Sequence, residues 1–214
     1  MKNLIRCSLV SGLLVASVNA APRQVIRLDG RWQIAEGTLN AVPAKFDHTV
    51  PVPGLVDMAT PAFKSPGSTV PEHERRQWKR PADPRREAFW YRRTFTIKGP
   101  VPPVAKLKVH KARYGTKVIL NGQPLGEHGP NFTPGWFDAK PALRAGQNEL
   151  IIRVGASLAQ VPPHLTDGWD FEKSRYIPGI YDSVELILSG APHVVNIQTV
   201  PDVEKKAVRA VVEL

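Results

Sequence analysis

The sequence predicts an all-β protein built from short antiparallel strands. Its 21 prolines and 16 glycines interrupt nearly every stretch long enough to hold a periodic helix. Between these interruptions, apolar and polar residues alternate with a period of two, which is typical of a strand with one buried face. An Asn-Gly pair between two such runs is the strongest short-range hairpin signal. Many short strands separated by Gly and Pro turns favour a β-sandwich.

Four runs show the alternation most clearly, and each is predicted to bury one face: 89–97, 105–109, 150–154 and 184–188. In the first of them, Phe89, Tyr91, Phe95 and Ile97 fall on the same side of the strand. Residues 24–28 and 31–34 are also predicted to be strands, on either side of an Asp29-Gly30 turn.

The central hairpin is predicted at Asn121-Gly122, after the β-branched run 118–120. Asn and Gly tolerate the positive φ angles that a type I′ turn requires at both central positions. A second turn at 145–148 precedes the strand 150–154, and we expect the Asn148 side chain to serve that turn.

The first 20 residues have the features of a signal peptide. Lys2 and Arg6 give a positive start, residues 9–18 form a short apolar segment, and Val18-Asn19-Ala20 is a small-residue cleavage site. We therefore expect an exported protein, periplasmic or extracellular. Cys7 is the only cysteine, so the mature chain would have neither a disulfide nor a thiolate metal site.

The chain is strongly basic. Its net charge is +10, and removal of Lys2 and Arg6 leaves +8. The positive residues concentrate between His73 and Arg93, at the end of a long insertion, 57–87, that shows no clear period. Such a run could bind an acidic polysaccharide or nucleic acid. A solvated loop is the interpretation we favour, because charge runs usually lie in solvent.

The sequence gives little support for a metal site or for the common catalytic motifs. The histidines are scattered without the spacing of zinc ligands, and no Ser-His-Asp arrangement, phosphate-binding loop or dinucleotide fingerprint is present. The sequence therefore predicts no metal and no cofactor.

Two loops combine aromatic and acidic residues in the way that sugar sites do, with aromatic faces for the apolar ring edges and carboxylates for the hydroxyls. The candidate sugar-binding residues are Trp136, Asp167, Trp169 and Asp170. The alternative for each tryptophan is a purely structural role, covering the rim of the sandwich or docking another domain.

A resemblance to a known family extends along this order of motifs. It rests on 28–32, 50–54, 91–95, Asn121-Gly122, Leu125-Gly126, Phe137-Asp138, Leu143, Gly146, Asn148, Leu150, Val154, Gly179-Ile180 and 184–186. In this order the chain resembles the amino-terminal sugar-binding domain of glycoside hydrolase family 2, which includes β-galactosidases, β-glucuronidases and β-mannosidases. The resemblance departs from the family at Lys111-Ala112, where Gly-Val is common, and in the 57–87 insertion.

The resemblance implies a jelly-roll type β-sandwich, galactose-binding-domain-like, followed by the start of an immunoglobulin-like domain. We therefore divide the chain into a signal peptide (1–20), a sugar-binding β-sandwich (21–190) and the first strands of a truncated immunoglobulin-like domain (191–214). Because two strands cannot bury a core of their own, we expect a fragment of a longer protein.

The family also implies where catalysis would occur. Its two catalytic glutamates lie on a (β/α)₈ barrel, of which this sequence has no trace. Asn148-Glu149 matches the Asn-Glu signature of the acid/base residue only outside its structural context, so we interpret the match as coincidental.

The resemblance thus implies a non-catalytic module of an exported glycoside hydrolase. Its expected partners are a carbohydrate and the missing domains, with no nucleic acid and no membrane. The rival hypotheses are a stand-alone carbohydrate-binding or adhesive module and a polyanion binder that uses His73 to Arg93.

Overall fold

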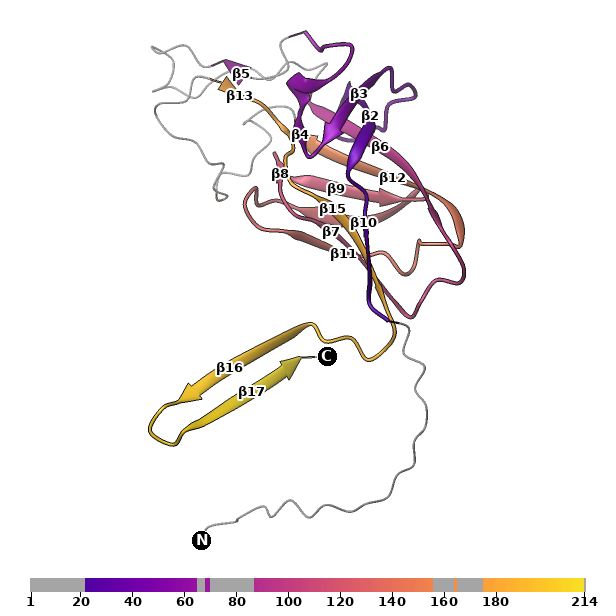
Figure 1. The fold of residues 1–214 in the computed structure, drawn as a ribbon. Helices are drawn as coiled ribbons and strands as arrows, with labels where there is room; N and C mark the ends of the chain where they lie inside the picture. Colours follow the sequence, from indigo (N-terminus) through magenta and orange to yellow (C-terminus); the bar gives the residue numbers. More distant parts are fainter. Residues whose placement is uncertain (1–21, 65–67, 70–86, 156–163, 165–174, 214) are drawn as a thin grey trace.

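The computed structural model describes residues 22–64, 68–69, 87–155, 164 and 175–213 of the chain. The described residues form antiparallel strands and one short 3₁₀ turn (Val56–Met58), with no α-helix among them. Two main sheets lie against each other in Figure 1. The predicted all-β class is therefore confirmed.

The smaller main sheet has four strands in the spatial order β1-β15-β7-β11. Their bounds are Gln24–Arg27 (β1), Val184–Ser189 (β15), Val104–Val109 (β7) and Gly135–Asp138 (β11). All three pairings are antiparallel, and β15 and β7 form the longest of them.

The larger sheet has six strands in the order β10-β9-β12-β6-β2-β3. Their bounds are Gln123–His128 (β10), Thr116–Leu120 (β9), Gly146–Gly155 (β12), Ala88–Ile97 (β6), Gly30–Gly37 (β2) and His48–Val52 (β3). The two central strands, β12 and β6, pair along their whole length, from Gly146 opposite Ile97 to Gly155 opposite Ala88.

Short strands complete the fold. A three-stranded sheet joins β4 (Gly54–Leu55), β14 (Gly179–Ile180) and β8 (Ala112–Arg113), and a separate pair joins β5 (Ser68–Thr69) to β13 (Arg175–Tyr176). The last two strands, β16 (Asn196–Asp202) and β17 (Ala207–Glu213), form a hairpin that pairs with no other described strand. Figure 1 shows this hairpin set apart from the two main sheets.

One continuous core lies between the inward faces of the two main sheets. Trp32, Phe89 and Tyr91 come from the six-stranded sheet, Leu107 and Leu186 come from the four-stranded sheet, and each is at most 2% exposed. Burial of such apolar side chains is the dominant favourable contribution to folding. The inner positions of the four alternating runs are buried as predicted or packed against this core: 89–97, 105–109, 150–154 and 184–188.

The outer face of the six-stranded sheet is not fully exposed to solvent, because it carries a second apolar cluster. Its buried members are Ala35, Phe46, Ala88, Trp90 and Ile151. The segment between β2 and β3 folds over them: the Trp90 indole donates to the Thr38 carbonyl (2.9 Å), and Arg153 donates to the Leu39 carbonyl (3.1 Å). Strand alternation could not predict this cover, since a returning loop leaves no mark on the period of the strand.

The predicted strands around Asp29-Gly30 are both present, but they belong to different sheets. β1 pairs with β15, whereas β2 pairs with β3 and β6. The Asp29 carboxylate fixes the crossover by accepting hydrogen bonds from the Ser183 hydroxyl (2.9 Å) and the Val184 backbone N–H (3.1 Å). Gly30 comes next at φ +118°, a conformation that residues with a Cβ rarely adopt.

The Asn121-Gly122 hairpin is confirmed. The two residues have φ angles of 51° and 82° and connect β9 directly to β10. Positive φ at both positions is what a type I′ turn requires.

The Asn148 amide ties the second turn to the first. Its oxygen accepts from the Arg144 backbone N–H (3.0 Å) and the Asn121 amide (2.7 Å), and its nitrogen donates to the carbonyls of Arg144 (2.8 Å) and Gly146 (2.9 Å). Asn121 in turn accepts from the Glu149 backbone N–H (2.9 Å). The buried Asn148 amide thus uses its full hydrogen-bonding capacity, and its predicted role in the turn is confirmed.

Substitution of Gly122 tests the turn. Gly122→Val should destabilise the protein by about 1 to 3 kcal/mol, because it places a β-branched residue at positive φ. A Cβ at this position would meet no atom within 4 Å, so the effect comes from the backbone alone. Gly122→Asn, which tolerates this region, should cost much less. Thermal unfolding of both variants would check this, and equal melting temperatures would contradict it.

Substitution of Asp29 tests the crossover. Asp29→Ala should destabilise the protein by about 1 to 3 kcal/mol, because it leaves the Val184 N–H and the Ser183 hydroxyl without their acceptor. Ser183→Ala is the matched control, since it removes only one of the two bonds and leaves Val184 satisfied. Urea unfolding should place Ser183→Ala between the wild type and Asp29→Ala. A larger loss of stability for Ser183→Ala than for Asp29→Ala would argue against the role of the Asp29 carboxylate in fixing the crossover.

Candidate functional site

Trp136 is the only predicted sugar-binding residue within the described part of the chain. Trp136 was predicted to lie in a loop, but it lies on the strand β11. Strand alternation turns Phe137 into the core at 4% exposure and Trp136 outward at 55%. Asp167, Trp169 and Asp170 lie outside the described residues. The structure therefore places Trp136 on the outer face of the four-stranded sheet.

Four residues cross this outer face in register, and we call them the outer-face row: Arg27, Glu185, Lys108 and Trp136. The Glu185 carboxylate lies 3.6 Å from Arg27 Nε and 2.9 Å from Nε2 of His110. At the other end of the row, Lys108 Nζ lies 4.9 Å from the centroid of the Trp136 ring, within the range of a cation–π contact. The row joins an exposed aromatic ring to charged groups that can donate to and accept from hydroxyls.

A second region of interest is the rim of the sandwich, where the small sheets lie. Figure 1 shows β4 and β8 at one end of the main sheets, with β5 and β13 beyond them. β5 lies within the 57–87 insertion, and β13 begins five residues after Asp170 in the sequence. Their antiparallel pairing joins Ser68 to Tyr176 and Thr69 to Arg175. No local signal in the sequence predicts this pairing, because the two segments lie far apart along the chain.

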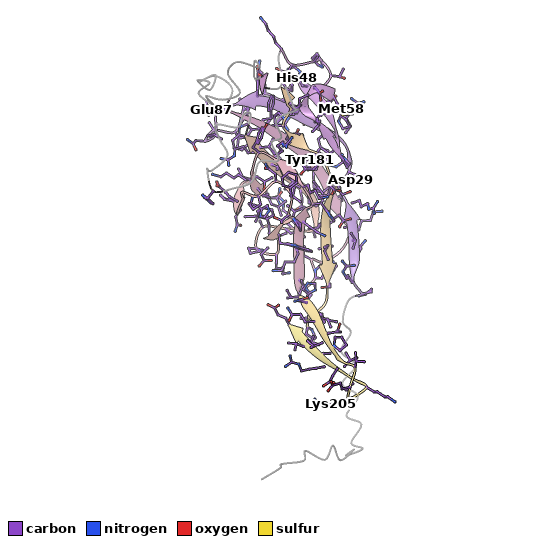
Figure 2. All side chains as sticks on the ribbon, turned by 90° about the vertical axis from the view of Figure 1, so that its left-hand side faces the viewer. Asp29, His48, Met58, Glu87, Tyr181 and Lys205 are labelled. Carbon is purple, nitrogen blue, oxygen red and sulfur yellow. The ribbon has the colours of Figure 1, made fainter. Side chains whose placement is uncertain are left out.

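Polar side chains brace the rim beneath these strands. The Tyr181 hydroxyl donates to the carbonyl of Asn131 (2.5 Å), a residue with no exposed surface. Lys111 Nζ lies 3.2 Å from the Asp182 carboxylate, which also accepts from the Ser183 N–H (2.8 Å). Because Ser183 also bonds Asp29, Tyr181 and Asp29 lie close together, as Figure 2 shows.

The pKa shifts at the rim result from these contacts. Burial raises the pKa of the Tyr181 phenol, and the nearby Arg113 and Lys111 cations oppose that shift. Burial also acts to raise the pKa of Asp182, but the bonds from the Ser183 N–H and the Lys111 ammonium outweigh it, so that this pKa lies below its ordinary value. At neutral pH the rim therefore presents a neutral phenol and an ionised carboxylate.

Tyr91 is a buried phenol in the core. Burial raises its pKa far above the ordinary value, the Asp57 carboxylate adds to the shift, and the Ile180 backbone opposes it. A phenol with so high a pKa stays protonated at neutral pH and is poorly matched to general acid or base catalysis.

Three of the described histidines make local contacts. His48 stacks on Phe63 with 4.0 Å between ring centroids and donates from Nδ1 to the Pro61 carbonyl (2.6 Å). His110 contacts Glu185, and His128 contacts the Thr133 carbonyl (2.9 Å). Among the described residues, no three His, Cys, Asp or Glu side chains converge where they could hold a metal ion.

The described end of the basic run is used within the fold. Arg92 Nε donates to the Gln33 amide (2.9 Å), and its guanidinium lies 4.2 Å from the centroid of the Phe46 ring. Arg93 donates to the Arg31 carbonyl (2.8 Å). These two cations therefore stabilise strand neighbours. The other basic residues of the run lie outside the described part: Arg75, Arg76, Lys79, Arg80, Arg85 and Arg86.

Glu149 is partly exposed on β12, opposite Thr94. Its backbone N–H belongs to the turn network of Asn121 and Asn148, which explains the Asn-Glu pair by turn geometry.

No helix within the described ranges has the length and apolar character needed to cross a membrane.

Comparisons with known proteins support the fold alone. No model of a known protein family matches the chain, and no curated protein matches it. Many solved structures do match.

A β-D-mannosidase from Dictyoglomus thermophilum aligns with 83% of this chain at 20% identity and a TM-score of 0.59. A Bifidobacterium dentium β-glucuronidase complexed with coumarin-3-O-glucuronide aligns with 84% at 19% identity and a TM-score of 0.56. The β-D-glucuronidase of Dictyoglomus thermophilum aligns with 90% at 16% identity and a TM-score of 0.56.

This chain spans only part of each of those proteins: 24% of the mannosidase and 32% and 33% of the two glucuronidases. The match is therefore to a portion of each protein that has the size of a domain. The chain has the fold of a domain found in β-mannosidases and β-glucuronidases, which confirms at the level of the fold the predicted resemblance to glycoside hydrolase family 2.

Proposed function

We propose that this chain is the non-catalytic, amino-terminal sugar-binding module of an exported glycoside hydrolase of family 2. The observation that carries the proposal is the alignment of 83–90% of the chain with a β-mannosidase and β-glucuronidases, of which it spans about a quarter to a third. The ordered motifs of the sequence supply independent support. The whole protein would hydrolyse O-glycosidic bonds, with its two carboxylates on a separate barrel domain.

The order of the strands supports a jelly-roll assignment for residues 21–190. The chain passes repeatedly between the two main sheets, since β6, β9, β10 and β12 lie in one and β7, β11 and β15 in the other. All pairings within both sheets are antiparallel. A double-sheet jelly roll of antiparallel strands combines these two properties.

The carboxyl-terminal hairpin supports the assignment of residues 191–214 to the start of an immunoglobulin-like domain. Strand alternation and register put one set of residues on a single, largely apolar face: Ile197, Thr199, Pro201, Val208, Ala210 and Val212. On that face Ile197 is 57%, Val208 66% and Val212 51% exposed. An isolated two-stranded hairpin is only marginally stable in water, so we expect another sheet to cover this apolar face.

Carbohydrate is the ligand that this proposal implies. The candidate residues Trp136, Asp167, Trp169 and Asp170 remain predictions, as do the signal peptide 1–20 and export to the periplasm or beyond.

The alternative is a stand-alone carbohydrate-binding or adhesive module without hydrolase activity. It shares the fold and differs only in the sequence beyond residue 214. A polyanion binder is less well supported, because Arg92 and Arg93 of the basic run are engaged inside the fold.

The gene sequence downstream of Leu214 decides between the first two functions. We expect it to continue through the immunoglobulin-like domain into a barrel with two glutamates, because the apolar face of the β16–β17 hairpin needs cover. Sequencing the source DNA would check this. A stop codon directly after Leu214 would favour the stand-alone module.

Enzyme assays test the non-catalytic role. The chain alone should not hydrolyse aryl-glycosides, because a retaining glycosidase needs two carboxyl groups about 5 to 5.5 Å apart. In the intact enzyme, Glu149→Gln should leave kcat near the wild-type value. Loss of a catalytic acid or nucleophile would lower kcat by several orders of magnitude. Such a loss with folding preserved would overturn the structural assignment of Glu149.

A further inference from the structure

The three described tryptophans divide into two kinds. Trp32 and Trp90 are each 1% exposed, and their indole N–H groups donate to the carbonyls of Leu28 (2.8 Å) and Thr38 (2.9 Å). Trp136 is 55% exposed, and its indole N–H has no hydrogen-bond partner among the described residues. Trp136 therefore contributes little to the fold and leaves most of its ring available to a ligand.

The cations on the outer face of the four-stranded sheet also divide into two kinds. On the outer face of the four-stranded sheet, Arg27 lies 3.6 Å from Glu185 and Lys106 lies 3.5 Å from Asp138. Lys108 lies two residues after Lys106 on β7, and its ammonium has no carboxylate partner in the described part of the chain. It contacts the Trp136 ring instead, at 4.9 Å from the centroid. Trp136 and Lys108 thus offer an exposed aromatic surface beside an ammonium that forms no ion pair with any described residue.

From these two observations we propose that the outer face of the four-stranded sheet binds an acidic sugar residue, with its ring against Trp136 and its carboxylate on Lys108. The apolar face of a pyranose packs on an indole, and the carboxylate forms a charge-assisted hydrogen bond with the ammonium. This site is separate from the rim. It rests on the proposed function only in taking the ligand to be a carbohydrate.

The neighbouring charges favour an acidic sugar over a polyphosphate chain. Asp138 lies two residues after Trp136 on the same face, and its side chain is 56% exposed. Glu185 lies directly across from Lys108. Both carboxylates can accept hydrogen bonds from sugar hydroxyls, but they would repel the closely spaced charges of a nucleic acid. One carboxylate on a hydroxyl-rich ring is the charge pattern that fits this face.

The methyl glycosides of glucuronic acid and glucose, which differ only in the carboxylate, test this site. Each is titrated into the whole ¹⁵N-labelled chain while the Trp136 indole signal is followed by NMR. The glucuronide should shift this signal saturably and bind about tenfold more tightly than the glucoside, as expected for one charge-assisted hydrogen bond. Lys108→Gln should abolish that preference, and Trp136→Ala should remove the shifts of neighbouring amide signals.

Lys106→Gln is the matched control, because it removes a cation from the same strand and face but one already paired with Asp138. It should leave the preference for glucuronide intact. Equal affinity for the two glycosides at Trp136 would overturn the acidic-sugar assignment and leave the proposed sugar-binding function standing. No shift at Trp136 with either sugar, or a stronger shift with a short oligonucleotide, would overturn the site itself. The downstream gene sequence tests the proposed function separately.

Discussion

The hydrogen bonds of Asp29 are the constraint on which the sandwich depends. One carboxylate holds the crossover from β1 to β2 against the start of β15, so that consecutive strands enter opposite sheets. If those strands paired with each other, Trp32 and the inner residues of β1 could not reach the same core from opposite sides. The hydrogen bonds of Asp29 also hold the segment 181–184 in place. Within this segment, Tyr181 and Asp182 contact other residues of the rim. The Asp29 carboxylate therefore stabilises both the core and the rim.

The two main sheets differ in how their outer faces are used. On the six-stranded sheet, the segment between β2 and β3 covers Trp90 and Ile151, and Arg92 and Arg153 hold it in place. On the four-stranded sheet, a charged row leaves Trp136 exposed beside Lys108. A covered apolar face stabilises the fold. The exposed Trp136 ring beside Lys108 is instead the surface at which we propose that a sugar binds.

The fold persists at 16–20% identity to the solved enzymes because its requirements are general. Alternating apolar positions and turns with positive φ can be met by many sequences. Function is not carried over in the same way, since it depends on particular side chains. The β16–β17 hairpin also exposes a largely apolar face.

The sequence by itself determined the local features: the inward positions of β6, β7, β12 and β15, the Asn121-Gly122 turn and the turn role of Asn148. Each results from a short-range rule, either strand alternation or the φ angles that Asn and Gly tolerate. Only the tertiary structure decided which sheet each strand joins, that a loop buries Trp90, and that β5 lies beside β13. Among the described residues, it also left Lys108 without a carboxylate partner, while Lys106 and Arg27 each gained one. These outcomes depend on contacts between distant residues, which leave no periodic signal in either partner.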